Sequence, residues 1–266
     1  MDKVTDRSPF EAAAPFYDRF RAPYPPEAVD YIVSAFGLDD RARVLDLGCG
    51  PGTLSIPLSL SAAEVIAIDP DESMLAEGKT LAAARGRGNI RWVHAAAEEV
   101  SPDLGLFRAV TMGQSFHWMK RDLVLERISA IVDARGGLAL VNPGKRRPQE
   151  SWEVVAGQVV TKYLGRRERH ASASPEPEHE PSLRRSGYFS HSTSREFPSE
   201  ITRDIPSILG CLYSSTGAAK PLFGDRAPQF EAALSQALLA ANPTGVFRER
   251  LETEVLIAPK SAGSWT

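Results

Sequence analysis

The hydrophobic positions between residues 44 and 141 change repeatedly from short continuous runs to a helical spacing. Short apolar runs bounded by acids, glycine or proline are typical of buried strands, whereas apolar residues three or four positions apart are typical of amphipathic helices. This alternation predicts an α/β fold with a parallel, doubly wound sheet. Strands are predicted at 44–47, 64–69, 89–94, 107–113 and 137–141, and helices at 54–63 (despite Pro57), 70–85 and 122–133.

The first forty residues have the pattern of short helices that precede this alternation. Residues 8–11 have the spacing of a capping box, and Pro15 should divide the helix into two short pieces. The second piece would carry the aromatic and basic residues of 17–21. Apolar residues at helical spacing predict another helix at 27–36, which Gly37 would end.

The regular pattern is lost after residue 142. The basic residues 145–147 could meet an anionic acceptor, although a solvated loop is the plainer interpretation. Because the alternating core would supply a cofactor site, residues 145–213 are expected to form the lid over the second substrate. A helix is predicted at 152–164, a polar exposed loop at 166–181, a strand at 194–197, helices at 201–213 and 230–240, and a strand at 246–257.

Composition and charge narrow the class of protein. The chain has 266 residues, 42% of them hydrophobic and 24% charged, which is typical of a globular protein with a sizeable core. A formal net charge of −3 argues against a nucleic-acid partner. Cys49 and Cys211 lie far apart, so no disulfide is expected. Without an apolar leader or an 18-residue apolar run, we expect a cytoplasmic protein with no membrane partner.

A glycine-rich loop follows the first predicted strand, at Gly48, Gly50 and Gly52. Glycines at such a loop let the backbone turn sharply and approach a ligand closely. The spacing is one residue shorter than the G-x-G-x-x-G of dinucleotide-binding folds, and Asp46 stands just before it. An acid there would repel a pyrophosphate but suit the ammonium group of S-adenosylmethionine (AdoMet). Asp69, which ends the second predicted strand, is the expected acceptor for ribose hydroxyls, or else only a cap for the next helix.

These residues resemble the first two motifs of the class I AdoMet-dependent methyltransferases, at 44–52 and 67–70. Residues 97–98 resemble the third motif of the family, and further segments resemble its small-molecule branch, at 16–21, 24–25, 114–118 and 213–215. Two positions depart from the family pattern, because Ala96 and Arg108 stand where acids are usual. The resemblance implies a Rossmann-like sheet of seven strands, mostly parallel with the last antiparallel. It also implies a single domain with a lid at 1–40, a cofactor core at 41–142, a cap at 143–187 and C-terminal elements at 188–266.

The resemblance and the spacing together predict the contacts of the cofactor. Met74 could flank the adenine or belong to the core. Tyr17, Arg21 and Tyr24 could close over the methionine end or pack as a plain amphipathic helix. The expected cofactor-binding residues are Tyr17, Arg21, Asp46, Gly48, Cys49, Gly50, Gly52, Asp69, Pro70, Met74, Ala97, Glu98, Gly113 and Gln114.

The sequence identifies the residues that would contact the methyl acceptor less specifically than those that would contact the cofactor. His117 follows the fourth predicted strand and is the candidate general base, because an imidazole exchanges protons near neutral pH. It could equally pack with Trp118 as a structural corner. Tyr24, Phe116, Trp118 and Tyr213 are the candidate acceptor contacts. The histidines lack metal-ligand spacing, so no metal is expected.

The predicted activity is methyl transfer to O, N or C of a small organic molecule by a monomer or homodimer. A catalytically silent cofactor-binding protein and an NAD-type dehydrogenase are the alternatives.

Overall fold

The computed structural model describes residues 12–143, 152–165 and 179–261, and its contacts divide the chain into two compact units. The core unit comprises Tyr24–Lys145, Ala171–Ser199 and Glu252–Thr266. The helical unit comprises Met1–Pro23, Arg146–His170 and Glu200–Leu251.

A seven-stranded sheet runs through the described part of the chain, in the order β3-β2-β1-β4-β5-β7-β6. The first five strands pair in parallel, and β7 pairs antiparallel to β5. This mostly parallel arrangement with an antiparallel late strand confirms the predicted fold class. The strands are β1 (Arg43–Leu47), β2 (Glu64–Asp69), β3 (Ile90–His94), β4 (Phe107–Gly113), β5 (Val132–Pro143), β6 (Thr193–Asp204) and β7 (Val246–Pro259).

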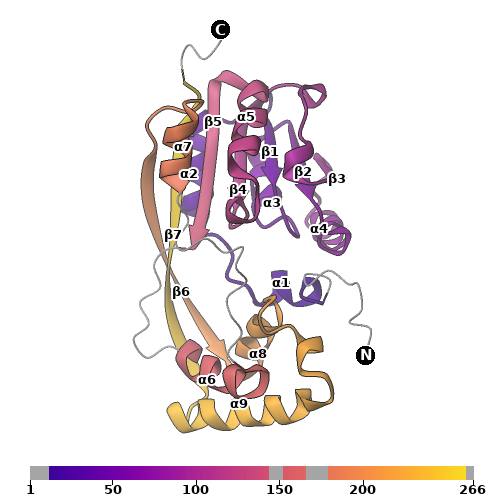
Figure 1. Cartoon of the computed structure of the whole chain (residues 1–266), viewed down its shortest axis with the longest axis vertical. Coiled ribbons are helices and arrows are strands. Elements are labelled where there is room, and N and C mark those ends of the chain that lie inside the picture. Colours follow the sequence, from indigo (N-terminus) through magenta and orange to yellow (C-terminus); the bar gives the residue numbers. More distant parts are fainter. Residues whose placement is uncertain (1–11, 144–151, 166–178, 262–266) are drawn as a thin grey trace. The chain divides into compact units, whose positions relative to one another are not determined.

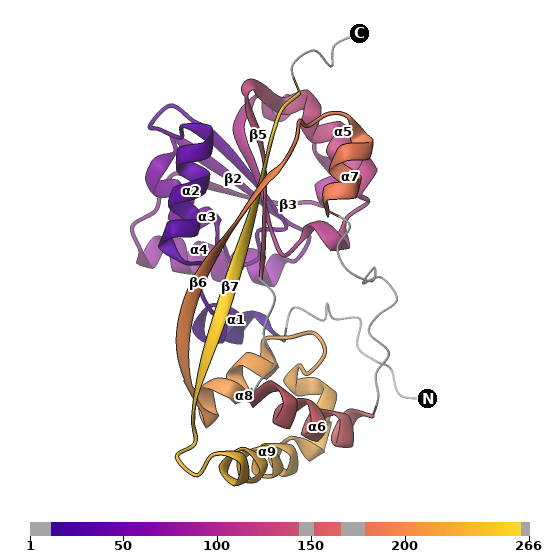
Figure 2. The ribbon, with the colours of Figure 1, turned by 90° about the vertical axis from the view of Figure 1, so that its left-hand side faces the viewer.

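Helices cover both faces of the sheet in the core unit (Figure 2). The side chains of β1 alternate between the faces: Val44 packs against the helices of one face, whereas Leu45 and Leu47 pack against those of the other. Both faces are therefore apolar, as expected for parallel strands buried between helices. The first face carries α2 (Pro26–Phe36), α3 (Ser55–Leu58) and α4 (Glu72–Ala84), and the second carries α5 (Arg121–Ile131) and α7 (His179–Ser186).

Figure 1 shows the ribbon of the helical unit. This unit has a core of its own, which contains a cluster of aromatic side chains. Phe223 and Phe230 stack with ring centroids 3.9 Å apart, and Tyr213 packs edge-on against Phe223. Helix α1 contacts α8, and α6 contacts α9. The helices are α1 (Ala14–Phe20), α6 (Trp152–Leu164), α8 (Ile205–Tyr213) and α9 (Ala227–Ala241). Short 3₁₀ turns lie at η1 (Ser59–Ser61), η2 (Ala97–Glu99), η3 (Pro102–Leu104), η4 (Phe116–Trp118) and η5 (Lys220–Arg226).

Three predicted elements of the core unit differ from the structure in their bounds. The predicted helix 54–63 is only α3 followed by η1, because the Asn89 side-chain amide donates to the carbonyls of Ser59 and Ala62 and ends the helical pattern there. Strand β5 starts at Val132 rather than at residue 137, with a register shift against β4. The predicted helix 122–133 accordingly ends at Ile131.

The largest corrections fall after residue 178. The part of the predicted loop 166–181 that the structure describes begins helix α7, at His179. The predicted strand 194–197 extends to Asp204, so the predicted helix 201–213 begins only at Ile205, where Asp204 accepts a hydrogen bond from the Ser207 amide at 2.9 Å. The predicted capping box at 8–11 and the basic residues 145–147 lie outside the described residues.

Candidate cofactor and acceptor site

The glycine loop lies at the edge where the parallel strands end, which is where open α/β sheets bind ligands. Gly48, Gly50 and Gly52 all have left-handed φ angles, of 64°, 54° and 85°. A side chain at Gly48 would collide with Ser115, and one at Gly52 would come within 2.6 Å of Trp92. Gly50 instead faces open space. The first and third glycines are thus needed for packing, and the second leaves room for a ligand.

Asp69 lies beside this open space. It is 8% exposed, and its two carboxylate oxygens accept the amides of Gly50 at 2.8 Å and Asp71 at 2.9 Å. Burial raises the pKa of Asp69, and these two hydrogen bonds oppose the rise. Each oxygen retains a further lone pair, so a pair of ribose hydroxyls fits the carboxylate. Asp71, rather than Asp69, caps α4, through the amides of Ser73 and Met74.

Asp46 is buried behind the loop rather than exposed beside it. Its carboxylate accepts the hydroxyls of Ser55 at 2.5 Å and Thr111 at 2.8 Å. Burial raises its pKa to about 6, against the lowering effect of these two hydroxyls. Asp46 therefore ties the loop to α3 and β4, and its predicted contact with an ammonium group stays a prediction.

The segment after β4 closes the other side of this edge. Gln114 is the only described residue other than glycine with a positive φ, 54°, and its amide donates to the Val141 carbonyl at 2.9 Å. The Gln114 side chain lies 3.4 Å from the Tyr24 hydroxyl. That hydroxyl sits directly over Gly113, where a Cβ would lie only 2.8 Å away. The structure thus brings together Tyr24, Gly113 and Gln114, three residues predicted for the site.

The turn η2 joins the same edge from the end of β3. Ala97 is buried in the core, and the Glu98 carboxylate accepts the Lys120 amide at 2.7 Å, which links η2 to the start of α5. Met74 is buried as well. Pro70 is exposed, with its carbonyl 3.0 Å from His94 Nε2.

The Cys49 thiol is buried, and burial raises its pKa well above the usual value. A buried thiol of raised pKa is a weak nucleophile, so nothing points to a chemical role for the Cys49 thiol.

His117 lies on η4, directly after this segment. Burial, with a further contribution from the charge of Arg121, lowers the pKa of His117 below 6.5, so its ring is neutral at neutral pH. Its ring centroid is 5.1 Å from that of Trp118, which is 50% exposed. Phe116 is buried and lies 5.4 Å from the ring of His179.

Three predicted residues belong to the helical unit. The Arg21 guanidinium lies over the Tyr17 ring at 5.2 Å and donates to the Ser214 hydroxyl at 3.0 Å. Tyr213 is buried in the aromatic core, and its hydroxyl donates to Glu231 at 2.8 Å. These contacts account for their local packing, and their cofactor and acceptor roles stay predictions.

Several residues build the site through contacts that the sequence did not predict. Ser115 donates its hydroxyl to the Leu47 carbonyl at 2.6 Å and so clamps the β4 segment to the glycine loop. Ser55 and Thr111 hold Asp46, and Trp92 packs on Gly52 and Gly78. Arg108, one of the two departures from the family pattern, pairs with Asp133 at 2.7 Å, which gives it a structural role.

The described residues contain no group of three or more metal-ligating side chains placed to hold an ion. None of their helices is long and apolar enough to cross a bilayer.

Comparisons with known proteins agree with the geometry. Residues 44–136 match the family model of a methyltransferase domain. An uncharacterized methyltransferase of Mycobacterium tuberculosis is 31% identical over 151 residues, which cover 57% of this chain and 58% of the relative. A ubiquinone biosynthesis O-methyltransferase of Bradyrhizobium diazoefficiens is 29% identical over 47% of this chain and 49% of the relative. The chain thus aligns with only about half the length of these curated relatives.

Solved structures share the fold over most of the chain. A protein of Anaeromyxobacter dehalogenans assigned as a type II methyltransferase superposes with a TM-score of 0.61 at 20% identity, over 91% of this chain and 97% of the other. The YcgJ protein of Bacillus subtilis superposes with a TM-score of 0.55 at 17% identity, over 89% and 99%. At these identities the likeness concerns the fold alone. The sheet order, the glycine loop with its strand-ending acid, and the methyltransferase domain matched at residues 44–136 together support a class I AdoMet-dependent methyltransferase.

Proposed function

We propose that this protein transfers the methyl group of AdoMet, the methyl donor of its family, to O, N or C of a small organic molecule. The observation that carries the proposal is the position of Asp69 beside Gly50, a glycine that faces open space at the carboxyl edge of the sheet. The products are the methylated acceptor and S-adenosylhomocysteine.

AdoMet supplies a methyl carbon activated by a sulfonium, and transfer forms the acceptor–carbon bond as the carbon–sulfur bond breaks. The protein's main task is to hold the acceptor in line with that bond. In the proposal, Asp69 accepts the ribose hydroxyls, the glycine loop passes close to the cofactor, and Gln114 and Tyr24 border its methionine end. Neutral His117 takes the proton from an acceptor that must lose one.

Two observations support a small molecule as the acceptor. A relative matched over half its length is a ubiquinone biosynthesis O-methyltransferase, and the net charge of −3 does not favour a polyanion. The absence of a nucleic-acid or membrane partner, a cytoplasmic location and a monomeric or homodimeric state belong to the same proposal.

A comparison of ligands tests the cofactor. S-Adenosylhomocysteine at about 100 times its dissociation constant is expected to stabilise the protein by ~2.7 kcal/mol, because it binds only the folded chain. NADH at the same concentration is expected to leave the thermal unfolding midpoint unchanged. Stabilisation by NADH alone would identify a dehydrogenase. Binding of S-adenosylhomocysteine without methyl transfer to any member of a diverse acceptor panel would identify a silent binding protein.

The pH dependence of turnover tests His117. Because the pKa of His117 is lowered, its imidazole is protonated, and stops acting as a base, only at a pH below 6.5. The acid limb of kcat should therefore lie at a lower pH than an unperturbed histidine would give. We expect His117→Ala to abolish this limb and to lower turnover more than S-adenosylhomocysteine affinity. Equal losses of turnover and affinity would make His117 a wall of the pocket instead.

A further inference from the structure

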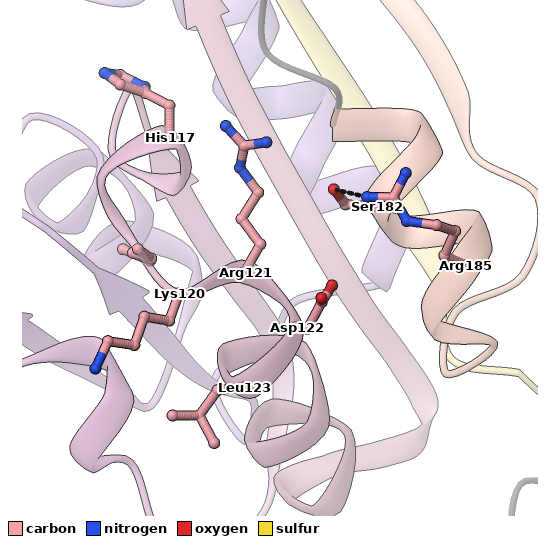
Figure 3. Close-up of a pocket in the computed structure, with 8 residues that line it drawn as sticks. His117, Lys120, Arg121, Asp122, Leu123, Ser182 and Arg185 are labelled. Atoms are coloured by element: carbon pink, nitrogen blue, oxygen red, sulfur yellow. Dashed lines mark hydrogen bonds between the residues drawn. The ribbon is translucent and has the colours of Figure 1, made fainter. Parts of the chain in front are cut away.

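A second feature of the core unit, separate from the glycine loop, is an open pocket of about 530 Å³ between the start of α5 and α7. Figure 3 shows Arg121 extending from α5 next to His117, with Ser182 and Arg185 opposite on α7. We call it the basic pocket. Its lining residues are His117, Met119, Lys120, Arg121, Asp122, Leu123, Ser182 and Arg185.

The charge of this lining is unbalanced. It carries three permanent cations, Lys120, Arg121 and Arg185, against one acid, Asp122. Arg121 is half-buried, its guanidinium lies 5.8 Å from the Phe116 ring, and its charge acts on the neighbouring rings of His117 and His179. A guanidinium withdrawn from water without a carboxylate partner is unfavourable until an anion pairs with it. Its planar fork matches the two oxygens of a carboxylate or phosphate.

Two further features of the pocket, on α5 and on α7, favour an anionic ligand. Lys120, the N-cap residue of the eleven-residue helix α5, makes no side-chain cap, although Glu98 accepts the Lys120 amide itself. The amides of the first turn and the helix dipole still favour negative charge beside the lining residues 120–123. On α7, the Ser182 hydroxyl accepts a hydrogen bond from Arg185 at 3.2 Å, which fixes that side chain at the pocket wall.

We propose that the basic pocket binds the anionic group, a carboxylate or a phosphate, of the methyl acceptor. His117 lines this pocket and also follows the β4 segment of the cofactor edge, so an acceptor anchored by Arg121 would have its uncharged part beside the candidate base. This inference rests on the proposed function and narrows the acceptor to an anionic small molecule.

Charge-matched probes test the pocket. Benzoate and phenyl phosphate represent the two sources of anionic oxygen, and benzamide is the neutral counterpart. We expect at least one anion to bind the protein saturated with S-adenosylhomocysteine ten or more times more tightly than benzamide, measured by titration calorimetry. Arg121→Gln should weaken that anion tenfold or more, whereas Arg121→Lys, which keeps the charge but not the fork, should weaken it less.

Arg184→Gln is the matched control, because Arg184 lies next to Arg185 on the same helix but is exposed outside the pocket. It should leave anion affinity within twofold of the unsubstituted protein. Equal binding of benzamide and both anions, or equal losses in Arg121→Gln and Arg184→Gln with thermal unfolding unchanged, would overturn the proposal.

A separate titration with S-adenosylhomocysteine distinguishes the two proposals. Its affinity should survive Arg121→Gln. If the unsubstituted protein fails to bind S-adenosylhomocysteine while anion binding still depends on Arg121, the methyl-transfer proposal fails but the anion site stands.

Discussion

Replacing Asp69 with alanine is expected to weaken S-adenosylhomocysteine binding by more than about tenfold, or ~1.4 kcal/mol. Each charge-assisted hydrogen bond from a ribose hydroxyl to this carboxylate is worth ~1.5–3 kcal/mol. The variant also frees the amides of Gly50 and Asp71, which the carboxylate holds at 2.8 and 2.9 Å. The glycine loop would then lose the position in which Gly50 leaves room for the ligand. Titration calorimetry measures the affinity directly.

Asp71→Ala is the control for this variant, because Asp71 is two residues away and caps α4. Loss of the cap should lower the free energy of unfolding by about 1 kcal/mol. The affinity for S-adenosylhomocysteine should stay within threefold of that of the unsubstituted protein. Asp69→Asn keeps one oxygen as an acceptor, so its affinity for S-adenosylhomocysteine should lie between those of the unsubstituted protein and Asp69→Ala. Unchanged affinity in a folded Asp69→Ala protein would remove Asp69 from the cofactor site.

The elements that the sequence predicted best are those whose signals are local. The predicted bounds of β2, β4 and α6 agree with the structure at both ends. The two strands are mainly apolar runs that end at Asp69 and Gly113, and α6 ends before Gly165, which has a left-handed φ of 76°. The glycine loop was equally readable, since left-handed φ angles at residues 48, 50 and 52 are a property of glycine itself.

The features that escaped prediction depend on partners far away in the chain. Thr111 is 65 residues from Asp46, and the local sequence at neither position predicts the hydrogen bond between their side chains. The polar segment that ends in α7 has few apolar residues, so its helix, and with it one wall of the basic pocket, could not be read from periodicity. Ile201, Ile205 and Ile208 fit a helical spacing, yet the first of them lies in β6 because of pairing within the sheet.

That misread strand carries Arg203, half of a buried ion pair in the helical unit. Its guanidinium donates from Nε to Glu249 Oε2 at 3.0 Å and from Nη1 to the Phe20 carbonyl at 2.8 Å. The Trp152 indole donates to the same Glu249 oxygen at 3.2 Å. The two charged side chains are only 6% and 7% exposed, so the pair joins β6, β7, α1 and α6 within a low-dielectric interior.

Glu249→Ala is therefore expected to destabilise the helical unit by ~3–5 kcal/mol, because it leaves the Arg203 charge buried without its counterion. Urea unfolding followed by far-ultraviolet circular dichroism measures the loss. The double variant Arg203→Met/Glu249→Leu should recover most of it, since two apolar side chains of similar size replace the pair without a stranded charge. Lys220→Gln is the matched control, because it breaks a more exposed ion pair of the same unit, with Glu231, and should cost no more than ~1 kcal/mol. A loss in Glu249→Ala no larger than that of the control would show that water reaches Arg203, and that the pair acts as a surface contact rather than as the centre of the unit.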